Sequence, residues 1–260
     1  MTSFIWRSVI TFFIPNYYNF LTDTDETKQV KLIKKSQLTH DTIEMTFELP
    51  QNMVLGLACG QHLVCYCGET SRKYTPTAMR VGSFDLVVKV YPDGILGNHM
   101  NKLNIGDELV VAGRPIGKNL YWGNGQFTVS NRAIAAKSIV FICAGSGITP
   151  IYAILQKMIE YNDTGIDAKV LYVNKMIYDI ILRDKLNAMA TENISIRYSL
   201  TRPDADWSGL KGRPTKEMIQ DILTKEKEQV VVICGSYDFN SDISQMCLDL
   251  GVVKEYIVKF

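Results

Sequence analysis

The stretch Ser138-Ile139-Val140-Phe141-Ile142-Cys143-Ala144-Gly145-Ser146-Gly147-Ile148-Thr149-Pro150 joins an apolar run to a glycine-rich turn. The apolar run predicts a buried strand, and Pro150 fits the first turn of a following helix, where its missing N–H costs little. Gly145 and Gly147 leave the backbone bare where the strand meets the helix. Because the amino end of a helix favours anions, this turn is a candidate phosphate-binding loop. A tight strand-to-helix turn without a ligand is the alternative.

The chain after Ser130 alternates between apolar strands and amphipathic helices. This pattern predicts a parallel sheet with helices on both faces. The predicted strands are Ser138–Cys143, Lys169–Asn174, Ser195–Leu200 and Val230–Cys234. The predicted helices are Pro150–Tyr161, Asp179–Thr191, Thr215–Thr224 and Asp242–Asp249.

The chain before this point consists of short alternating runs separated by turn residues, which predict a closed β-barrel or a sandwich. The runs are Gln29–Lys34, Thr42–Leu49, His62–Cys67, Phe84–Tyr91 and Glu108–Ala112, with a helical insert at Gly97–Asn104. The pattern changes near Asn131. We therefore divide the chain into a lead-in (residues 1–27), a β domain (28–130) and an α/β domain (131–260).

A second strand-end signal is Val230-Val231-Val232-Ile233-Cys234-Gly235. Its carboxyl end is expected beside the first glycine turn, at the edge where open α/β sheets bind ligands. Cys234 would then project into the cleft. A small buried thiol in a sheet is the alternative.

A third motif, Arg72-Lys73-Tyr74-Thr75-Pro76, lies in the β domain. The guanidinium of Arg72 offers fixed, bidentate donors suited to a pyrophosphate. Tyr74 adds an aromatic face and Thr75 a hydroxyl for a planar ring. The alternative is an exposed strand whose charged and aromatic residues merely alternate.

Composition excludes several classes of function. The 28 basic and 27 acidic residues balance, so no electrostatic footprint for nucleic acid is present. The six cysteines form no CxxC pair and no iron–sulfur or zinc spacing, so no metal site is expected. They fit a reducing, cytoplasmic location. The histidines His40, His62 and His99 are interpreted as structural.

The segment Phe4–Ile14 is apolar and aromatic and stops before Pro15. It is shorter than the about 20 apolar residues that span a bilayer, and it has no signal-cleavage site. Two interpretations stay open. It is an interfacial anchor, which would attach the protein to the cytosolic face of an internal membrane, or it packs on the body of the protein.

The order of these motifs resembles the NADH–cytochrome b5 reductase family, within the ferredoxin–NADP reductase superfamily. The resemblance runs from about Lys31 to Phe260. The segments that carry it are 38–42, 55–62, 72–76, 86–92, 105–107, 113–117, 145–150, Cys234-Gly235 and the terminal Phe260. It implies a six-stranded antiparallel flavin barrel followed by a nicotinamide-binding α/β domain.

By resemblance, the site residues divide between two cofactors, FAD and NADH. Arg72 would hold the FAD pyrophosphate, Tyr74 would lie against the isoalloxazine, and Thr75 would contact its reactive edge. Cys234 would sit beside the reacting carbon of the nicotinamide. The other expected cofactor contacts are Val87, Lys89 and Tyr91 along the flavin strand, Gly94, Leu96 and Gly97 at the FAD phosphates, Thr149 at the flavin, Gly145, Ser146 and Gly147 at NADH, Thr201 at the coenzyme ribose, Gly235 beside Cys234, and Phe260 at the carboxyl end.

The sequence departs from the family pattern in three places. Gly94-Ile95-Leu96-Gly97 replaces Gly-Lys-Met-Ser, which removes a lysine and a hydroxyl from the FAD phosphate site. Ser236-Tyr237-Asp238-Phe239 replaces prolines after Cys-Gly, so a freer loop is expected beside the nicotinamide. Thr201-Arg202 replaces an Asp that would repel a 2′-phosphate, so NADPH is expected to be tolerated better than in a typical member.

The expected activity is transfer of electrons from NADH through FAD to a one-electron haem acceptor, cytochrome b5 above all, by a monomeric enzyme. A quinone or ferric-chelate acceptor is the second enzyme reading. A degenerate flavin-fold protein that only binds a partner is the non-enzyme reading.

Overall fold

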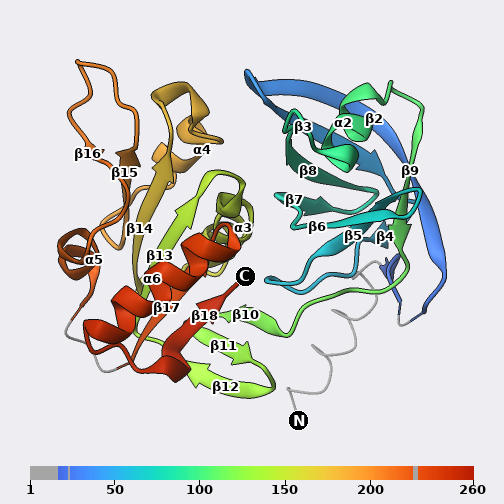
Figure 1. The fold of residues 1–260 in the computed structure, drawn as a ribbon. Helices are drawn as coiled ribbons and strands as arrows, with labels where there is room; N and C mark the ends of the chain where they lie inside the picture. The colour runs from blue at the N-terminus through green and yellow to red at the C-terminus, as the bar shows by residue number, and fades with distance from the viewer. Residues whose placement is uncertain (1–16, 23, 225–227) are drawn as a thin grey trace, which may run out of the picture.

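The computed structural model describes residues 17–22, 24–224 and 228–260. They form two lobes that lie side by side, joined by a small sheet at one end (Figure 1). The N-terminal segment 4–14, for which we expect either a membrane contact or packing on the protein, lies outside the described residues. Among the helices that are described, none is long and apolar enough to cross a membrane.

The first lobe is an antiparallel sheet of seven strands in the order β6-β5-β9-β2-β3-β8-β7. Five of them match the five predicted strand runs, β6 carries the Arg72–Tyr74 motif, and β7 pairs with β8 around the turn at Gly82. The core inside the sheet holds Leu32, Met45, Phe47 and Phe84, all fully buried. The strands are β2 (Thr27–Thr39), β3 (Thr42–Glu48), β5 (Leu63–Cys67), β6 (Thr70–Tyr74), β7 (Ala78–Arg80), β8 (Ser83–Lys89) and β9 (Glu108–Ala112), and one helix, α2 (Ile95–Lys102), follows β8.

The second lobe is a parallel sheet in the order β16-β15-β14-β13-β17-β18. The chain moves outward from β13 to β16 and then returns to β17 on the other side of β13. The carboxyl ends of β13 and β17 therefore flank a topological switch point, where open α/β sheets bind ligands. The strands are β13 (Ser138–Ala144), β14 (Asp167–Asn174), β15 (Ile194–Leu200), β16 (Leu210–Lys211), β17 (Gln229–Cys234) and β18 (Ile257–Lys259).

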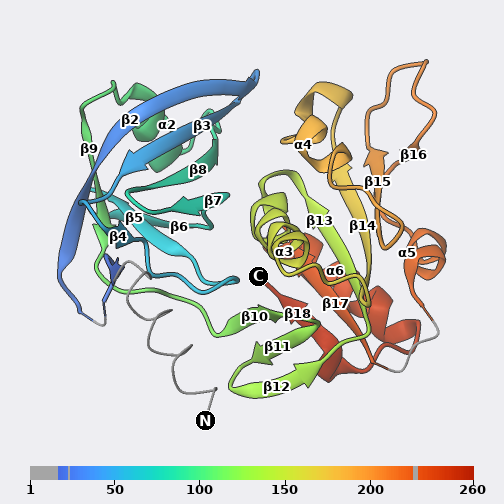
Figure 2. The same cartoon turned by 180° about the vertical axis from the view of Figure 1, so that it is seen from behind.

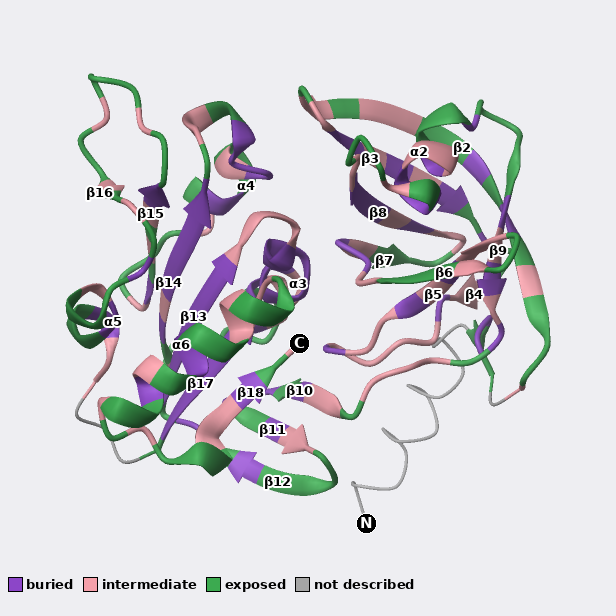
Figure 3. Ribbon diagram, in the orientation of Figure 1, coloured by how far each residue is buried: buried purple, intermediate pink, exposed green. Residues whose placement is uncertain are grey.

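Helices cover both faces of this sheet, as predicted (Figure 2). The helix α3 packs on the face that carries Phe141, and α5 and α6 pack on the face that carries Ile142. The central strands β13, β14 and β17 are buried along most of their length (Figure 3). The helices are α3 (Ile148–Glu160), α4 (Arg183–Asn187), α5 (Lys216–Ile222) and α6 (Tyr237–Asp249), with 3-10 turns η1 (Gly145–Gly147), η2 (Ile177–Asp179) and η3 (Lys254–Tyr256).

The predicted helix Asp179–Thr191 is shorter in the structure. Leu182 adopts a left-handed conformation (φ 60°), which breaks the helical path between η2 and α4. The regular helix therefore begins only at Arg183 and ends at Asn187.

A three-stranded antiparallel meander, β10 (Asn119–Gly123), β11 (Gln126–Val129) and β12 (Arg132–Ala135), follows the first lobe in the chain and packs on the core of the second. The domain boundary that we place between residues 130 and 131 falls in the turn between β11 and β12. Tyr121 ties both sides together, since its backbone N–H donates to the Cys59 carbonyl (2.8 Å) and its hydroxyl donates to the Asp163 carboxylate. A short parallel pair, β1 (Tyr18–Asn19) with β4 (Met53–Val54), completes the first lobe.

Candidate active site

A cavity of about 700 Å³ lies on the seam between the lobes. Segments far apart in the sequence meet there, including Arg72–Thr75 of the first lobe and Ser146–Thr149 of the second. Fifteen of the seventeen predicted cofactor residues line it: Arg72, Tyr74, Thr75, Val87, Lys89, Tyr91, Gly94, Leu96, Gly97, Ser146, Gly147, Thr149, Cys234, Gly235 and Phe260. We call it the flavin cavity.

The two remaining residues, Gly145 and Thr201, line a neighbouring cavity of about 670 Å³. The two cavities share the lining residues Lys89, Tyr91, Ala144 and Ser236, so they are contiguous. We call the second one the coenzyme cavity. The site thus has two compartments that meet at the ends of β8 and β13.

The glycine turn lies against the end of β17. Cys143 of β13 pairs in register with Cys234 of β17, which confirms that the two strand ends are neighbours. A Cβ atom on Gly147 would lie 2.2 Å from the carbonyl oxygen of Cys234, so only glycine fits there. Gly145 has a positive φ (53°), and its carbonyl accepts a hydrogen bond from the Tyr172 hydroxyl (2.9 Å). These contacts fix the conformation of the turn and leave its backbone without side chains at positions 145 and 147.

Burial keeps the site's phenol and thiol neutral. It raises the pKa of the Tyr74 hydroxyl to about 12, and it raises the pKa of the Cys234 thiol to about 12. Tyr74 also packs against the core of the first lobe. Cys234 can therefore border a bound ring as a neutral, polarizable group, and it is not a thiolate nucleophile.

The amino end of α2 forms the phosphate side of the flavin cavity. Gly94 is the N-cap residue and brings no side-chain hydrogen bond to the helix. The side-chain amide of Asn98 fixes the segment that leads into α2, because it donates to the carbonyls of Tyr91 (2.8 Å) and Gly94 (2.7 Å). The first-turn N–H groups of residues 95–97 are the donors that a phosphate would take.

Gly97, which stands where the family pattern has Ser, lies close to β8. A Cβ on Gly97 would lie 3.3 Å from the Lys89 carbonyl oxygen, so β8 passes close to the helix. Ile95, which stands in place of the family's lysine, is 62% exposed. The backbone donors of α2 remain, while both side-chain contributions are lost.

The segment after Cys234-Gly235 differs from its expectation. Ser236 caps α6, and its hydroxyl accepts from the Phe239 N–H (3.3 Å). Tyr237 to Phe239 therefore form the first turn of a helix, and they do not form the freer loop that the missing prolines suggest. Gly235 packs against the Phe239 ring: a Cβ atom on Gly235 would lie 2.5 Å from Cδ1 of Phe239.

Sequence reasoning missed His62, which lines the flavin cavity. Its Nε2 is buried and has no hydrogen-bond partner among the described residues. Burial, and then the charge of Lys73, lower the pKa of His62 to about 4, so the ring is neutral. The available signal was its position, one residue before Leu63, which pairs with Tyr74 across β5 and β6.

Sequence reasoning also missed two cations of the coenzyme cavity, Lys175 and Arg213, which accompany Arg202. Backbone hydrogen bonds bring them together: Arg202 N–H donates to the Lys175 carbonyl (2.8 Å), and the N–H of Gly212, beside Arg213, donates to the Leu200 carbonyl (2.8 Å). Asp238 and Asp242 line the same cavity from α6.

Comparison with known proteins agrees with this two-compartment site. Residues 29–121 match the family model of the oxidoreductase FAD-binding domain, and residues 141–245 match that of the oxidoreductase NAD-binding domain. The chain is 32% identical over 250 residues to NADH–cytochrome b5 reductase 1 of Arabidopsis thaliana, covering 92% of this chain and 85% of that protein.

Two further similarities concern nitrate reductases. The chain is 33% identical over 226 residues to the NADH nitrate reductase of Spinacia oleracea, covering 79% of this chain but 24% of that protein. It superimposes on the crystal structure of the cytochrome b5 reductase domain of Ulva prolifera nitrate reductase with a TM-score of 0.83 and 27% identity, covering 94% of this chain and 100% of that domain. The chain therefore belongs to the NADH–cytochrome b5 reductase family of flavin-dependent oxidoreductases, with an FAD-binding antiparallel lobe and an NAD-binding parallel lobe.

Proposed function

We propose that this protein takes electrons from NADH through FAD and passes them singly to a haem protein, with cytochrome b5 as the acceptor. The observation that carries the proposal is the meeting of Arg72–Thr75 and Ser146–Thr149 on one cavity that continues into a second. When both cofactors are bound, NADH supplies a hydride, and FAD accepts it and releases the electrons one at a time. The protein positions and insulates these groups.

The lining of the flavin cavity fits FAD. The unpartnered Nε2 of His62 costs about 1–3 kcal/mol while it stays unsatisfied, and a bound heterocycle with polar edges would relieve that cost. The α2 amino end and the guanidinium of Arg72 offer donors for a pyrophosphate. We assign Tyr74 and Thr75 to the ring and Cys234 to the nicotinamide side.

The haem acceptor is supported by the relatives, whose names include cytochrome b5 reductase in both the Arabidopsis and the Ulva proteins. The test is an anaerobic titration. We expect yellow protein whose flavin absorbance is bleached by NADH, and then reoxidised with one equivalent of electrons per added ferricytochrome b5. Bleaching with no reoxidation by cytochrome b5, but with reoxidation by a quinone or ferric chelate, would replace the acceptor. A colourless protein that takes up no FAD would favour a partner-binding role.

For the coenzyme, we propose that NADPH is tolerated better than in a typical member of the family, with NADH as the main donor. The neutral Thr201 lies beside Arg202 in the coenzyme cavity, where Lys175 and Arg213 add two further cations. These cations favour binding of a 2′-phosphate, whereas the carboxylates of Asp238 and Asp242, which line the same cavity from α6, disfavour it. Steady-state kinetics with both coenzymes tests the proposal. A kcat/KM ratio above about a thousandfold in favour of NADH, ~4 kcal/mol, would overturn it.

A further inference from the structure

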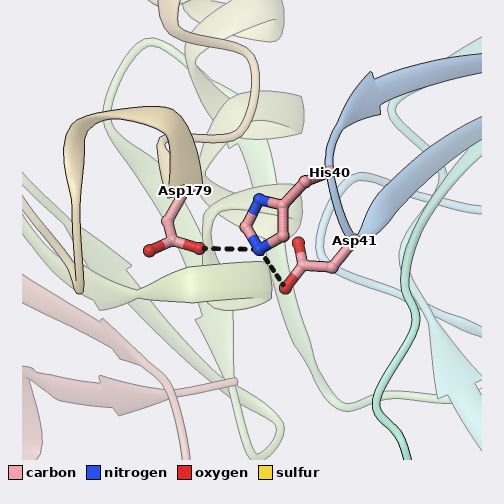
Figure 4. Close-up of side chains that lie close together, drawn as sticks. All are labelled: His40, Asp41 and Asp179. Atoms are coloured by element: carbon pink, nitrogen blue, oxygen red, sulfur yellow. Dashed lines mark ion pairs between the residues drawn. The ribbon is translucent and has the colours of Figure 1, made fainter.

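A charged cluster joins the two lobes at the edge of the coenzyme cavity, and Figure 4 shows three of its side chains, His40, Asp41 and Asp179. It consists of His40, Asp41 and Lys89 from the first lobe and Asp179 from the second, and we call it the Lys89 clasp. Lys89 is the one basic residue, among those the structure describes, that lines both the flavin and the coenzyme cavities. Asp179 also lines the coenzyme cavity.

The Lys89 ammonium lies closer to the carboxylate of Asp41, in its own lobe, than to that of Asp179 in the other lobe. Its Nζ lies 2.8 Å from Asp41 Oδ1 and 2.7 Å from Asp41 Oδ2, but 3.8 Å from Asp179 Oδ1. All three groups are largely withdrawn from water, with exposed side-chain fractions of 12% for Lys89, 26% for Asp41 and 9% for Asp179. Such a pair is screened less than a surface pair, so it resists separation more strongly.

Both carboxylates are fixed by further hydrogen bonds. Asp41 Oδ1 accepts from the hydroxyls of Thr39 (3.0 Å) and Thr42 (3.1 Å), and Asp179 Oδ2 accepts from the Met176 N–H (2.9 Å). Burial raises the pKa of Asp41, but the hydrogen bond and charge of Lys89, together with the two hydroxyls, outweigh it and lower the pKa overall. Asp41 therefore stays charged, and the ammonium has a defined position.

His40 sits across the seam from Asp179. Its Nε2 lies 3.5 Å from Asp41 Oδ2 and 3.7 Å from Asp179 Oδ1, and its ring meets Tyr178 edge to face at 5.5 Å. The three side chains in Figure 4 have the spacing of a metal site, with ligand atoms within 4.8 Å of one another. The ammonium of Lys89 already pairs with both carboxylates, so we assign the cluster to ion pairing and not to a metal ion.

We infer that Asp41 and Asp179 are positioning residues for hydride transfer: they hold Lys89 at the junction of the two cavities and thereby set the spacing of the lobes. The inference rests on the proposed function. Val87, two residues before Lys89 on β8, packs into the core of the second lobe, so β8 is the part of the first lobe whose position the clasp fixes. Hydride transfer depends steeply on distance, and a misplacement of about 1 Å can cost about a hundredfold in rate.

The test compares Asp179→Asn and Asp41→Asn with Lys185→Gln as the matched control. Lys185 also crosses the seam, since its Nζ pairs with Glu44 Oε1 at 2.8 Å, but it lines neither cavity. The readouts are FAD content, and the limiting rate and apparent dissociation constant for flavin reduction by NADH in stopped flow. We expect both Asp variants to keep their FAD and to lose about tenfold in limiting rate, with less than a threefold change in the dissociation constant. Lys185→Gln should change neither by more than about twofold.

Asp179→Glu should recover part of the rate, because it restores the charge with one added methylene. Wild-type rates in both Asp variants, or an equal loss of rate in Lys185→Gln, would overturn the inference. Loss of FAD from Asp179→Asn would also overturn it, because it would indicate a merely structural role. Failure of the wild-type protein to be bleached by NADH would contradict the proposed function instead. In that case small-angle scattering decides on the clasp, which predicts a larger radius of gyration for both Asp variants than for Lys185→Gln.

Discussion

Gly147 lies directly against Cys234: a Cβ atom on Gly147 would be 2.2 Å from the carbonyl oxygen and 2.6 Å from the carbonyl carbon of Cys234. The contact joins the ends of β13 and β17 at the switch point of the parallel sheet. It explains why a glycine stands inside the turn even though its backbone conformation is one that other residues adopt (φ −61°). The two strand-end motifs are therefore one structural unit.

The first prediction concerns this contact. Gly147→Ala forces the turn away from β17, and overpacking of this kind costs about 1–3 kcal/mol of unfolding free energy. We expect that loss in chemical denaturation, together with slower flavin bleaching by NADH. Gly165→Ala is the control, because a Cβ there meets nothing within 4 Å. Equal stability of the two variants would contradict the contact.

The second prediction concerns FAD retention. Arg72 lines the flavin cavity from β6, the strand that also carries Tyr74, and a charge-assisted hydrogen bond to a phosphate contributes about 1.5–3 kcal/mol. Arg72→Ala should therefore weaken FAD binding by about ten- to a hundredfold, measured as flavin released on dilution or by fluorescence titration of the apoprotein.

The control for Arg72 is Arg114→Ala, which removes an exposed arginine that pairs with Asp25 (2.8 Å) and lines no described cavity of the site. Unchanged flavin occupancy in Arg72→Ala, or the same loss in both variants, would count against the assigned role of Arg72.

The sequence predicted the two-lobe architecture because its hydrophobic patterns are regular. Residues 138–143 are buried in a central parallel strand, and the turn that follows depends on glycine for conformation at Gly145 and for close approach at Gly147. Such local signals are readable from one sequence. The positions of Arg72 and Cys234 on one cavity were expected from the resemblance to the family.

What the sequence did not predict depends on contacts between distant segments. His62 was interpreted as structural because its unpartnered nitrogen shows only when the cavity wall is assembled. Asp179 was predicted to begin an α-helix, but the left-handed conformation of Leu182 interrupts that helix. The Asp179 carboxylate instead faces Lys89. Lys175 and Arg213 join Arg202 only because β14, β15 and β16 end at the same edge.

The third prediction concerns coenzyme choice. Thr201→Asp places a carboxylate in the coenzyme cavity beside Arg202, where it repels a 2′-phosphate and pairs with the cation that would bind it. We expect kcat/KM for NADPH to fall about tenfold, ~1.4 kcal/mol, while kcat/KM for NADH changes less than threefold. Thr164→Asp, at an exposed position that lines neither cavity, should leave both values unchanged. A parallel fall for both coenzymes would contradict a 2′-phosphate subsite.

The last prediction concerns acid stability of the protein without FAD. Burial and Lys73 lower the pKa of His62 to about 4, below the ordinary value of 6.5, so the unfolded chain binds a proton that the folded protein rejects. The stability that His62 contributes is thus present above pH 6.5 and is lost as the pH falls toward 4. Since the ring is half-buried and partly screened, we expect a contribution of about 1 kcal/mol.

His62→Gln removes this titration, so between pH 7 and 4.5 its melting temperature should fall less than that of the wild type, by about 2–4 °C for a chain of this size. Other groups that titrate in acid, such as Asp41, are common to both proteins and cancel in the comparison. His99→Gln, on α2 and outside the flavin cavity, serves as the control and should follow the wild type. If His62→Gln loses stability in acid as steeply as the wild type, His62 is not the neutral ring that its buried position requires.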